Sequence, residues 1–185
     1  TKEMDPDKFF LPTSASGPKF AATEEDFGKG LHHDVHGPWQ YMGNPEHYHY
    51  FNGDDSLFRS EVGAPGPSNS SLIKKYSGDC DVYPDENNPL WRRNGWWLEL
   101  DQYKAENGQL PSTLEDYVEW GRKRQAEILT RGVKSCKDRF PECGGIILWM
   151  GHDCFPCTAN TSLVDFEGNP KPAAVEISKI FNKTV

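Results

Sequence analysis

The chain has 185 residues, of which 36% are hydrophobic and 26% are charged, and this length is sufficient for one domain with a buried core. It contains no run of about 18 apolar residues, so no membrane-spanning segment is expected. The net charge of -8 and the scattered Lys and Arg residues argue against a nucleic-acid partner, because phosphate binding requires a basic face.

A neutral small ligand fits this composition better. Aromatic residues make up 12% of the chain, and six of them are Trp. Exposed aromatic rings stack against the apolar faces of sugars, although most Trp side chains in proteins pack in the core.

The early part of the chain predicts short strands between polar loops. Residues 9–12 predict an apolar strand, residues 20–29 a loop with at most one helical turn, and residues 31–36 a second strand. Residues 43–55 predict a polar and aromatic loop.

The second strand raises the question of a metal site, because it contains three His residues. His32, Asp34 and His36 would share one face of the strand. No carboxylate or Cys elsewhere is tied to them by a recognisable spacing, so polar groups lining a pocket are the preferred interpretation.

A single carboxylate, Glu61, follows an apolar run and precedes small and turn-forming residues in the stretch 57–66. This pattern is typical of the end of a buried strand. Such a strand end gives a nucleophilic carboxylate a rigid mount, nearby hydrogen-bond donors and a free face. The alternative is that Glu61 is an ordinary surface residue at a strand end.

Helices dominate the next part of the chain. Residues 68–77 predict a short helix, and residues 90–108 are ambiguous, with their two Trp residues assigned to packing. The clearest helix runs over residues 112–134 and opens with a capping box between Ser112 and Glu115.

The last part combines one strong strand with a final helix. Residues 144–150 are continuously apolar, as in a parallel strand that is buried on both faces. Residues 163–166 predict an extended piece, and a turn follows it at residues 168–170. Pro172 opens the final helix, whose buried side is expected to carry Ala173, Ala174, Ile177, Ile180 and Phe181.

The five Cys residues leave the redox compartment open, because their number is odd. Cys154 and Cys157 have the spacing of a redox or zinc motif, but no second Cys pair completes a zinc site. We interpret the cysteines as structural or incidental thiols, and one disulfide among them stays an open alternative.

Four predicted strands that alternate with loops and helices, with polar residues after the strands, indicate a βα repeat. This is the organisation of a barrel whose active site lies at the carboxyl ends of its strands. A complete barrel has eight strands and about 250 residues, so this chain would supply about half of one. Half a barrel leaves open sheet edges, which either the remainder of the barrel or a second copy of the chain would cover.

Three motifs occur in a recognisable order: Phe58-Arg59-Ser60-Glu61-Val62-Gly63, then Leu148-Trp149-Met150-Gly151-His152-Asp153-Cys154-Phe155-Pro156, then Leu163-Val164-Asp165-Phe166-Glu167-Gly168-Asn169-Pro170-Lys171-Pro172-Ala173. Together they resemble the nucleophile strand, the eighth strand and the terminal signature of the catalytic (β/α)8 TIM barrel of glycoside hydrolase family 2. More weakly, Asp34-Val35-His36 resembles the family's sixth strand, and residues 10–14 resemble its fifth.

The resemblance implies that residues 1–185 form one incomplete domain, the C-terminal half of the barrel with about strands 5 to 8. It implies a retaining β-glycosidase, most similar to the β-mannosidase and exo-β-glucosaminidase branch, in which Glu61 forms a covalent glycosyl-enzyme. Trp149 would form the floor under the sugar, and His36, Trp39 and Asp153 would line its site. The expected partner is a carbohydrate substrate, with no metal and no cofactor.

The chain also departs from the family. Met150, His152 and Phe155 stand where this branch usually has Gln, Asn and Trp, and the Asn-Glu pair that carries the family's acid/base is missing from the sequence. Because retaining hydrolysis requires two carboxylates, the segment is expected to be one piece of a larger enzyme and inactive alone. The alternatives are a carbohydrate-binding barrel relative without catalysis and a metal-dependent protein built on the histidines.

Overall fold

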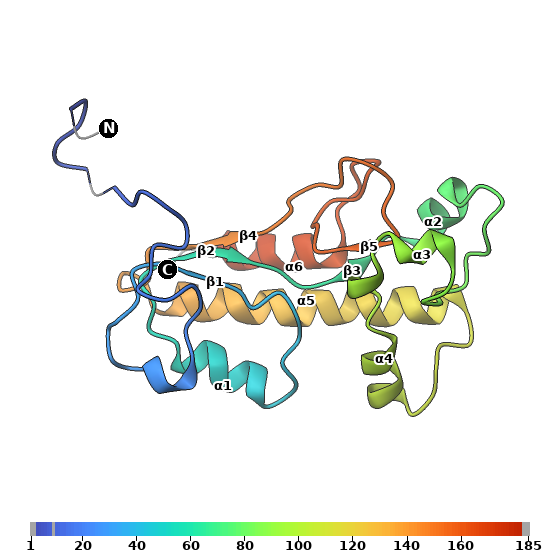
Figure 1. Cartoon of the computed structure of the whole chain (residues 1–185), viewed down its shortest axis with the longest axis horizontal. Coiled ribbons are helices and arrows are strands. Elements are labelled where there is room, and N and C mark those ends of the chain that lie inside the picture. The colour runs from blue at the N-terminus through green and yellow to red at the C-terminus, as the bar shows by residue number, and fades with distance from the viewer. Residues whose placement is uncertain (1–2, 9, 183–185) are drawn as a thin grey trace.

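The structure of the chain is a computed structural model that describes residues 3–8 and 10–182. Its centre is a parallel sheet with the strand order β1-β2-β4, formed by β1 (Val35–His36), β2 (Arg59–Val62) and β4 (Ile146–Leu148). One long helix, α5 (Leu114–Asp138), runs along the sheet (Figure 1). The architecture is therefore mixed α/β with a parallel sheet.

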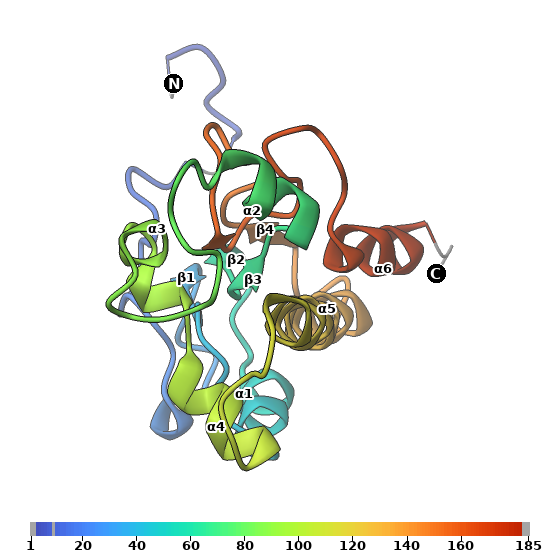
Figure 2. The same cartoon turned by 90° about the vertical axis from the view of Figure 1, so that its right-hand side faces the viewer.

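Two shorter helices flank α5, as the view along its axis shows (Figure 2). These are α1 (Glu46–Gly53) and α6 (Pro172–Phe181). Ile128 and Leu129 of α5 form one buried cluster with Ile177 of α6, against which both ends of β4 pack. Each such buried aliphatic side chain contributes roughly 1.5–3 kcal/mol to folding, so this layer of helices fixes the sheet.

The remaining elements lie around this frame. A second, two-stranded antiparallel sheet pairs β3 (Gly66–Pro67) with β5 (Ala159–Asn160). Around the N-terminal end of α5 gather four short elements (Figure 1): α2 (Ser70–Tyr76), α3 (Pro89–Arg92), the 3-10 helix η2 (Gly95–Trp97) and α4 (Leu100–Asn107). A single 3-10 turn, η1 (Glu24–Asp26), precedes β1. Within the described part of the chain, no helix has both the length and the apolar character needed to cross a membrane.

The predicted helices α2, α5 and α6 are confirmed, but the capping box of α5 lies one residue later than expected. Thr113, not Ser112, is the N-cap: its hydroxyl accepts from the Asp116 amide at 3.1 Å, and Asp116 Oδ2 accepts from the Thr113 amide at 3.0 Å. This register turns Leu114 into the core and leaves Glu115 outside, where it pairs with Lys74 at 2.5 Å.

The prediction of a loop over residues 43–55 is wrong, because most of this stretch is α1. His47, Tyr50 and Phe51 are buried on one side of the helix, at spacings of three and four residues. Two of these three side chains carry polar atoms, so the hydrophobic periodicity that reveals an amphipathic helix is weak here. Burial lowers the pKa of His47 to about 4, consistent with its place in the packing layer.

The first two predicted strands are shorter than expected or absent. Phe9 lies outside the described residues, and residues 10–12 form no strand. Of the expected strand 31–36, only Val35 and His36 belong to β1. The physical reason is that a loop occupies the outer edge of β1: the His33 amide donates to the Gly17 carbonyl at 3.1 Å, and the His36 amide donates to the Phe20 carbonyl at 2.9 Å.

The strand predicted over residues 144–150 exists as β4, but its burial on both faces is wrong. Ile146 and Leu148 pack toward the helices, whereas Ile147 points to the other face and is 53% exposed. That face of β4 is therefore partly open to solvent in the described chain. Phe181, expected on the buried side of α6, is also exposed, because it lies in the last turn of that helix.

The position of the cap yields a direct test. Replacing Thr113 by Ala removes an acceptor from the first turn of α5 and should lower the free energy of unfolding by about 1 kcal/mol. Ser112→Ala is the matched control and should change it by less than about 0.3 kcal/mol. Urea unfolding of both variants measures the difference, and a larger loss in Ser112→Ala would contradict the observed register.

Candidate active site

The carboxyl ends of the three parallel strands meet at one edge of the sheet, and each end carries a residue that the sequence singled out. His36 is the last residue of β1, Glu61 is the third residue of β2, and Trp149 directly follows β4. In the sheet register His36 lies opposite Glu61, and Val62 lies opposite Leu148. The strands therefore bring these side chains together from three distant parts of the sequence.

Main-chain hydrogen bonds continue the sheet just beyond the strand ends. The Gly37 amide donates to the Glu61 carbonyl at 2.8 Å, the Gly63 amide to the Pro38 carbonyl at 3.2 Å, and the Trp149 amide to the Val62 carbonyl at 2.8 Å. These bonds fix the backbone on both sides of Glu61. A rigid backbone here is what allows a carboxylate to keep one orientation.

The side chain of Glu61 is held by two neighbours. The Trp39 indole Nε1–H donates to Glu61 Oε1 at 2.8 Å, and His36 Nδ1 lies 3.7 Å from Glu61 Oε2. The side chain of Glu61 is 24% exposed. It is thus oriented by hydrogen bonding and open on one side only, unlike a surface carboxylate that is free in water.

His36 is in turn fixed by two serines. Its Nε2 lies 2.8 Å from Ser14 Oγ, and the Ser14 hydroxyl donates to Ser60 Oγ at 2.7 Å. Ser14 therefore bridges His36 and Ser60. This arrangement sets the orientation of the imidazole beside Glu61.

Glu61 opens into a cleft of about 650 Å³. Its wall is rich in aromatic side chains, and the Trp and Tyr residues that line it are Trp39, Tyr41, Tyr50, Trp97 and Trp149. The Trp149 ring meets Trp39 edge-on at 6.4 Å and Trp97 edge-on at 6.2 Å between centroids. Aromatic walls around a single oriented carboxylate suit a polar ligand with apolar faces, such as a sugar.

A buried cation supports this edge of the sheet from below. Arg59 is 1% exposed, forms an ion pair with Asp54 at 2.6 Å, and donates through Nη1 to the Gly37 carbonyl. Its guanidinium lies over the rings of Tyr50 and Phe51, with distances of 5.3 and 5.2 Å to their centroids. Arg59 therefore ties the turn that carries Trp39 to β2 and to the end of α1.

The known proteins that this chain is similar to agree with the resemblance found in the motifs. The chain is 26% identical to the "Beta-mannosidase B" of Neosartorya fischeri over 190 residues, covering 98% of this chain and 21% of that protein, and 27% identical to that of Aspergillus niger, covering 98% and 21%. The chain is β-mannosidase-like. It spans about a fifth of the length of these curated relatives.

The fold of this β-mannosidase-like segment agrees with a solved structure, the β-D-mannosidase from Dictyoglomus thermophilum. The TM-score is 0.67 at 20% identity, and the match covers 85% of this chain and 20% of the other. At this identity the likeness concerns the fold. A comparison with protein-family models finds no match.

Asp153 does not join the other predicted residues of the site. It is buried, it is not among the residues that line the cleft, and its Oδ1 accepts from Asn160 Nδ2 at 2.8 Å. The Asp153 amide also donates to the Val164 carbonyl at 3.0 Å. This hydrogen bond holds Asp153 against the loop that follows β5. The structure thus unites Glu61, Trp149, His36 and Trp39, and it places Asp153 in a separate polar cluster.

The histidines of the alternative metal hypothesis have different neighbours. His32 Nε2 lies 3.3 Å from Asp26 Oδ2, whereas His36 faces Ser14 and Glu61. Over residues 3–8 and 10–182, no group of three or more His, Cys, Asp or Glu side chains is arranged to hold a metal ion.

Two residues of the candidate site were not assigned to it from the sequence. Trp97 lines the cleft, while its neighbour Trp96 is 77% exposed, and nothing in the Trp-Trp pair distinguishes the two. Ser14 reaches His36 across 22 positions of sequence, and its surroundings indicate only a loop. Both contacts are tertiary, so no local pattern could have revealed them.

The buried ion pair beneath the site gives a prediction about stability. Asp54→Asn removes the negative charge that compensates Arg59 and should lower the free energy of unfolding by about 3 kcal/mol, because an uncompensated charge would stay buried. The matched control is Asp55→Asn, which makes the same change one residue later, where the carboxylate accepts from the Gly30 amide in an exposed position. It should cost less than about 1 kcal/mol. Equal losses in urea unfolding would contradict the role given to Arg59.

Proposed function

We propose that this chain is the C-terminal half of a (β/α)8-barrel catalytic domain of glycoside hydrolase family 2, in which β1, β2 and β4 are the sixth, seventh and eighth strands. Two findings support the proposal. The three strands are parallel and collect Glu61, His36 and Trp149 at their shared carboxyl edge, where barrel enzymes have their active sites. The similarity to β-mannosidases extends over 98% of the chain.

In the proposed reaction Glu61 is the nucleophile of a retaining β-glycosidase. Its carboxylate attacks the anomeric carbon as a proton from the enzyme's acid goes to the leaving oxygen, and water then hydrolyses the glycosyl ester. The observation that carries this role is the oriented state of Glu61, which is held by Trp39 at 2.8 Å and is open to the aromatic cleft. The hydrogen bond from Trp39 leaves Oε2 of the carboxylate for the sugar.

The substrate in this proposal is a terminal β-linked mannoside, by analogy with the β-mannosidase relatives. Trp149 would form the floor under the sugar ring, and Trp39 and His36 would lie at the side of the nucleophile. The rings of Trp39 and Trp97 are steeply inclined to the Trp149 ring, with 6.4 and 6.2 Å between centroids, and all three line the cleft in which the sugar would bind.

The second carboxylate must come from outside this segment. Among the described residues that line the cleft, Glu61 is the only Asp or Glu. Retaining glycosidases require an acid/base about 5–5.5 Å from the nucleophile. In our proposal it comes from the remainder of the barrel, which would also cover the exposed face of β4 around Ile147.

Covalent labelling tests the nucleophile. The full-length protein, treated with 2-deoxy-2-fluoro-β-mannosyl fluoride and digested, should carry one fluoromannosyl group on the peptide that contains Glu61, because the fluorine slows hydrolysis of the glycosyl ester. Glu61→Gln should abolish the label, and the exposed Glu86→Gln should keep it. A label on another carboxylate, or none despite measurable binding of mannosides, would overturn the role of Glu61, and the second result would favour the carbohydrate-binding relative.

The dependence on an external acid is tested with the isolated segment. The 185 residues alone should show no turnover of an aryl β-mannoside, because the described residues that line the cleft include only one of the two required carboxylates. The rate is measured against the same segment with Glu61→Gln. Turnover by the unmodified segment that Glu61→Gln abolishes would show that the chain supplies its own acid and would refute this part of the proposal.

A further inference from the structure

Two thiols far from the cleft face each other at the connection between α5 and β4. Cys136 lies in the last turns of α5, and Cys143 follows after a tight turn in which the Cys143 amide donates to the Arg139 carbonyl at 3.1 Å. Both side chains are buried, and both line the same cavity. All five cysteines are free thiols in the structure.

The two thiols are chemically unequal. The hydrogen bond from Cys136, supported by the positive charges of Arg139 and Arg59, lowers the pKa of Cys143 below its ordinary value. The same hydrogen bond, together with burial, raises the pKa of Cys136. Because the thiolate is the reactive form of cysteine, Cys143 is the nucleophile of the pair.

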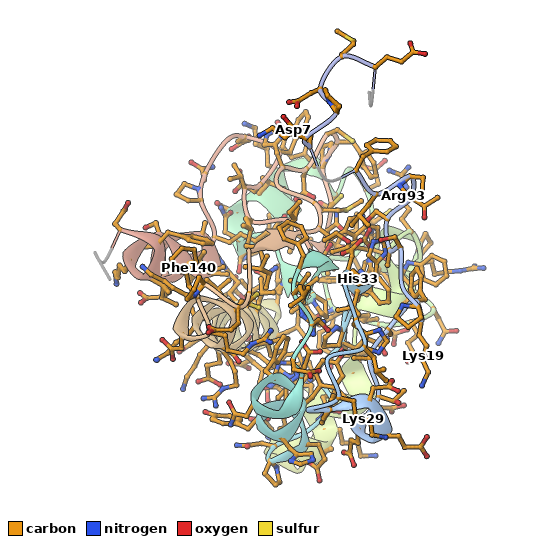
Figure 3. The ribbon with its side chains drawn as sticks, turned by 90° about the vertical axis from the view of Figure 1, so that its left-hand side faces the viewer. Asp7, Lys19, Lys29, His33, Arg93 and Phe140 are labelled. Carbon is orange, nitrogen blue, oxygen red and sulfur yellow. The ribbon has the colours of Figure 1, made fainter. Side chains whose placement is uncertain are left out.

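A small molecule can approach the pair from solution. A cavity of about 330 Å³ is lined by both cysteines and by Phe140 and Phe181, whose side chains are largely exposed. Figure 3 shows Phe140 at the surface, beside the ends of α5 and α6. The volume suits part of a low-molecular-weight disulfide.

We propose that Cys136 and Cys143 are a site of reversible covalent modification, which forms an intramolecular disulfide by exchange with a small-molecule disulfide of the glutathione type. The Cys143 thiolate attacks one sulfur of oxidised glutathione and releases one glutathione thiolate. The Cys136 thiol then loses its proton, attacks the Cys143 sulfur of the mixed disulfide and releases the second glutathione. In total two protein thiols are oxidised, and one glutathione disulfide is reduced to two thiols.

In the pair of Cys154 and Cys157, which has the redox spacing in the sequence, Cys154 is exposed and the Cys157 thiol is buried and disfavoured as a thiolate. Burial raises the pKa of Cys157 to about 12, and the Asp153 carboxylate acts in the same direction. The positive charge of Lys171 acts in the opposite direction but does not offset these two effects. The Cys154 and Cys157 pair therefore provides an internal control.

The disulfide would constrain the connection between α5 and β4, the strand that precedes Trp149 of the candidate site. The disulfide would close the chain from 136 to 143, between the end of α5 and the start of β4, and Trp149 directly follows β4. Such a link restricts the unfolded chain and stabilises the folded one. This effect is independent of whether Glu61 is a nucleophile.

Peptide mapping tests the proposal. The full-length protein is equilibrated with reduced or oxidised glutathione, alkylated with N-ethylmaleimide under denaturing conditions, and cleaved with trypsin and chymotrypsin, which separates Cys143 from Cys154 after Trp149. Oxidised glutathione should link the tripeptide Ser135-Cys136-Lys137 to the peptide of Cys143 and should raise Tm by a few degrees. Full alkylation of Cys136 and Cys143 after oxidation, with or without a link between Cys154 and Cys157, would overturn the proposal.

Single variants test the order of attack. Cys136→Ser should accumulate one glutathione on Cys143, because no resolving thiol remains, whereas Cys143→Ser should react at least tenfold more slowly at Cys136. The double variant Cys154→Ser, Cys157→Ser should still form the link. Equal rates of modification in the two single variants would contradict the assignment of Cys143 as the nucleophile. The mapping of the unmodified protein decides the pairing even if a variant fails to fold.

Discussion

The buried guanidinium of Arg59 is the constraint on which the candidate site depends. A charge taken out of water is tolerated only where partners satisfy it, so each partner of Arg59 is fixed in space. Those partners are Asp54 at the end of α1, the Gly37 carbonyl after β1, and the rings of Tyr50 and Phe51. The Gly37 carbonyl is decisive, because it precedes the turn that carries Trp39 and thereby sets the hydrogen bond to Glu61. One ion pair thus joins helix, sheet and site.

The family resemblance assigned to the site three residues that the structure finds at the ends of neighbouring strands. Glu61, His36 and Trp149 lie at the ends of parallel strands, and the carboxyl ends of such strands must meet at one edge. The sequence could not predict Ser14 or Trp97, whose roles come from loops that pack onto this edge. Asp153 was misplaced because the chain leaves the edge right after Trp149. Met150 has a φ of 64°, in the left-handed region, and the backbone then pairs with the loop at Val164.

The fold was predicted where hydrophobic patterns are strong and was missed where polar side chains are buried. The 25 residues of α5 carry a clear apolar stripe, while α1 buries His47 and Tyr50 and was taken for a loop. Burial on both faces was expected for β4 because its residues are all apolar, yet Ile147 is exposed. The apolar composition of a strand indicates only that the strand could be buried. Whether both of its faces are covered depends on other segments, which the sequence of the strand does not specify.

The terminal motif that resembles the family's signature has a structural role in this chain. Asp165 Oδ1 accepts from the amides of Glu167 and Asn169 at 3.0 and 2.9 Å, which closes the turn before α6. Lys171, at the N-cap of α6, is buried and donates to the Gly66 carbonyl of β3 at 2.7 Å, and burial lowers its pKa to about 8. The motif therefore anchors α6 to the small sheet, away from Glu61. Similarity in this motif supports a shared architecture, whereas the proposed chemistry depends on the carboxylate and the indoles at the strand ends.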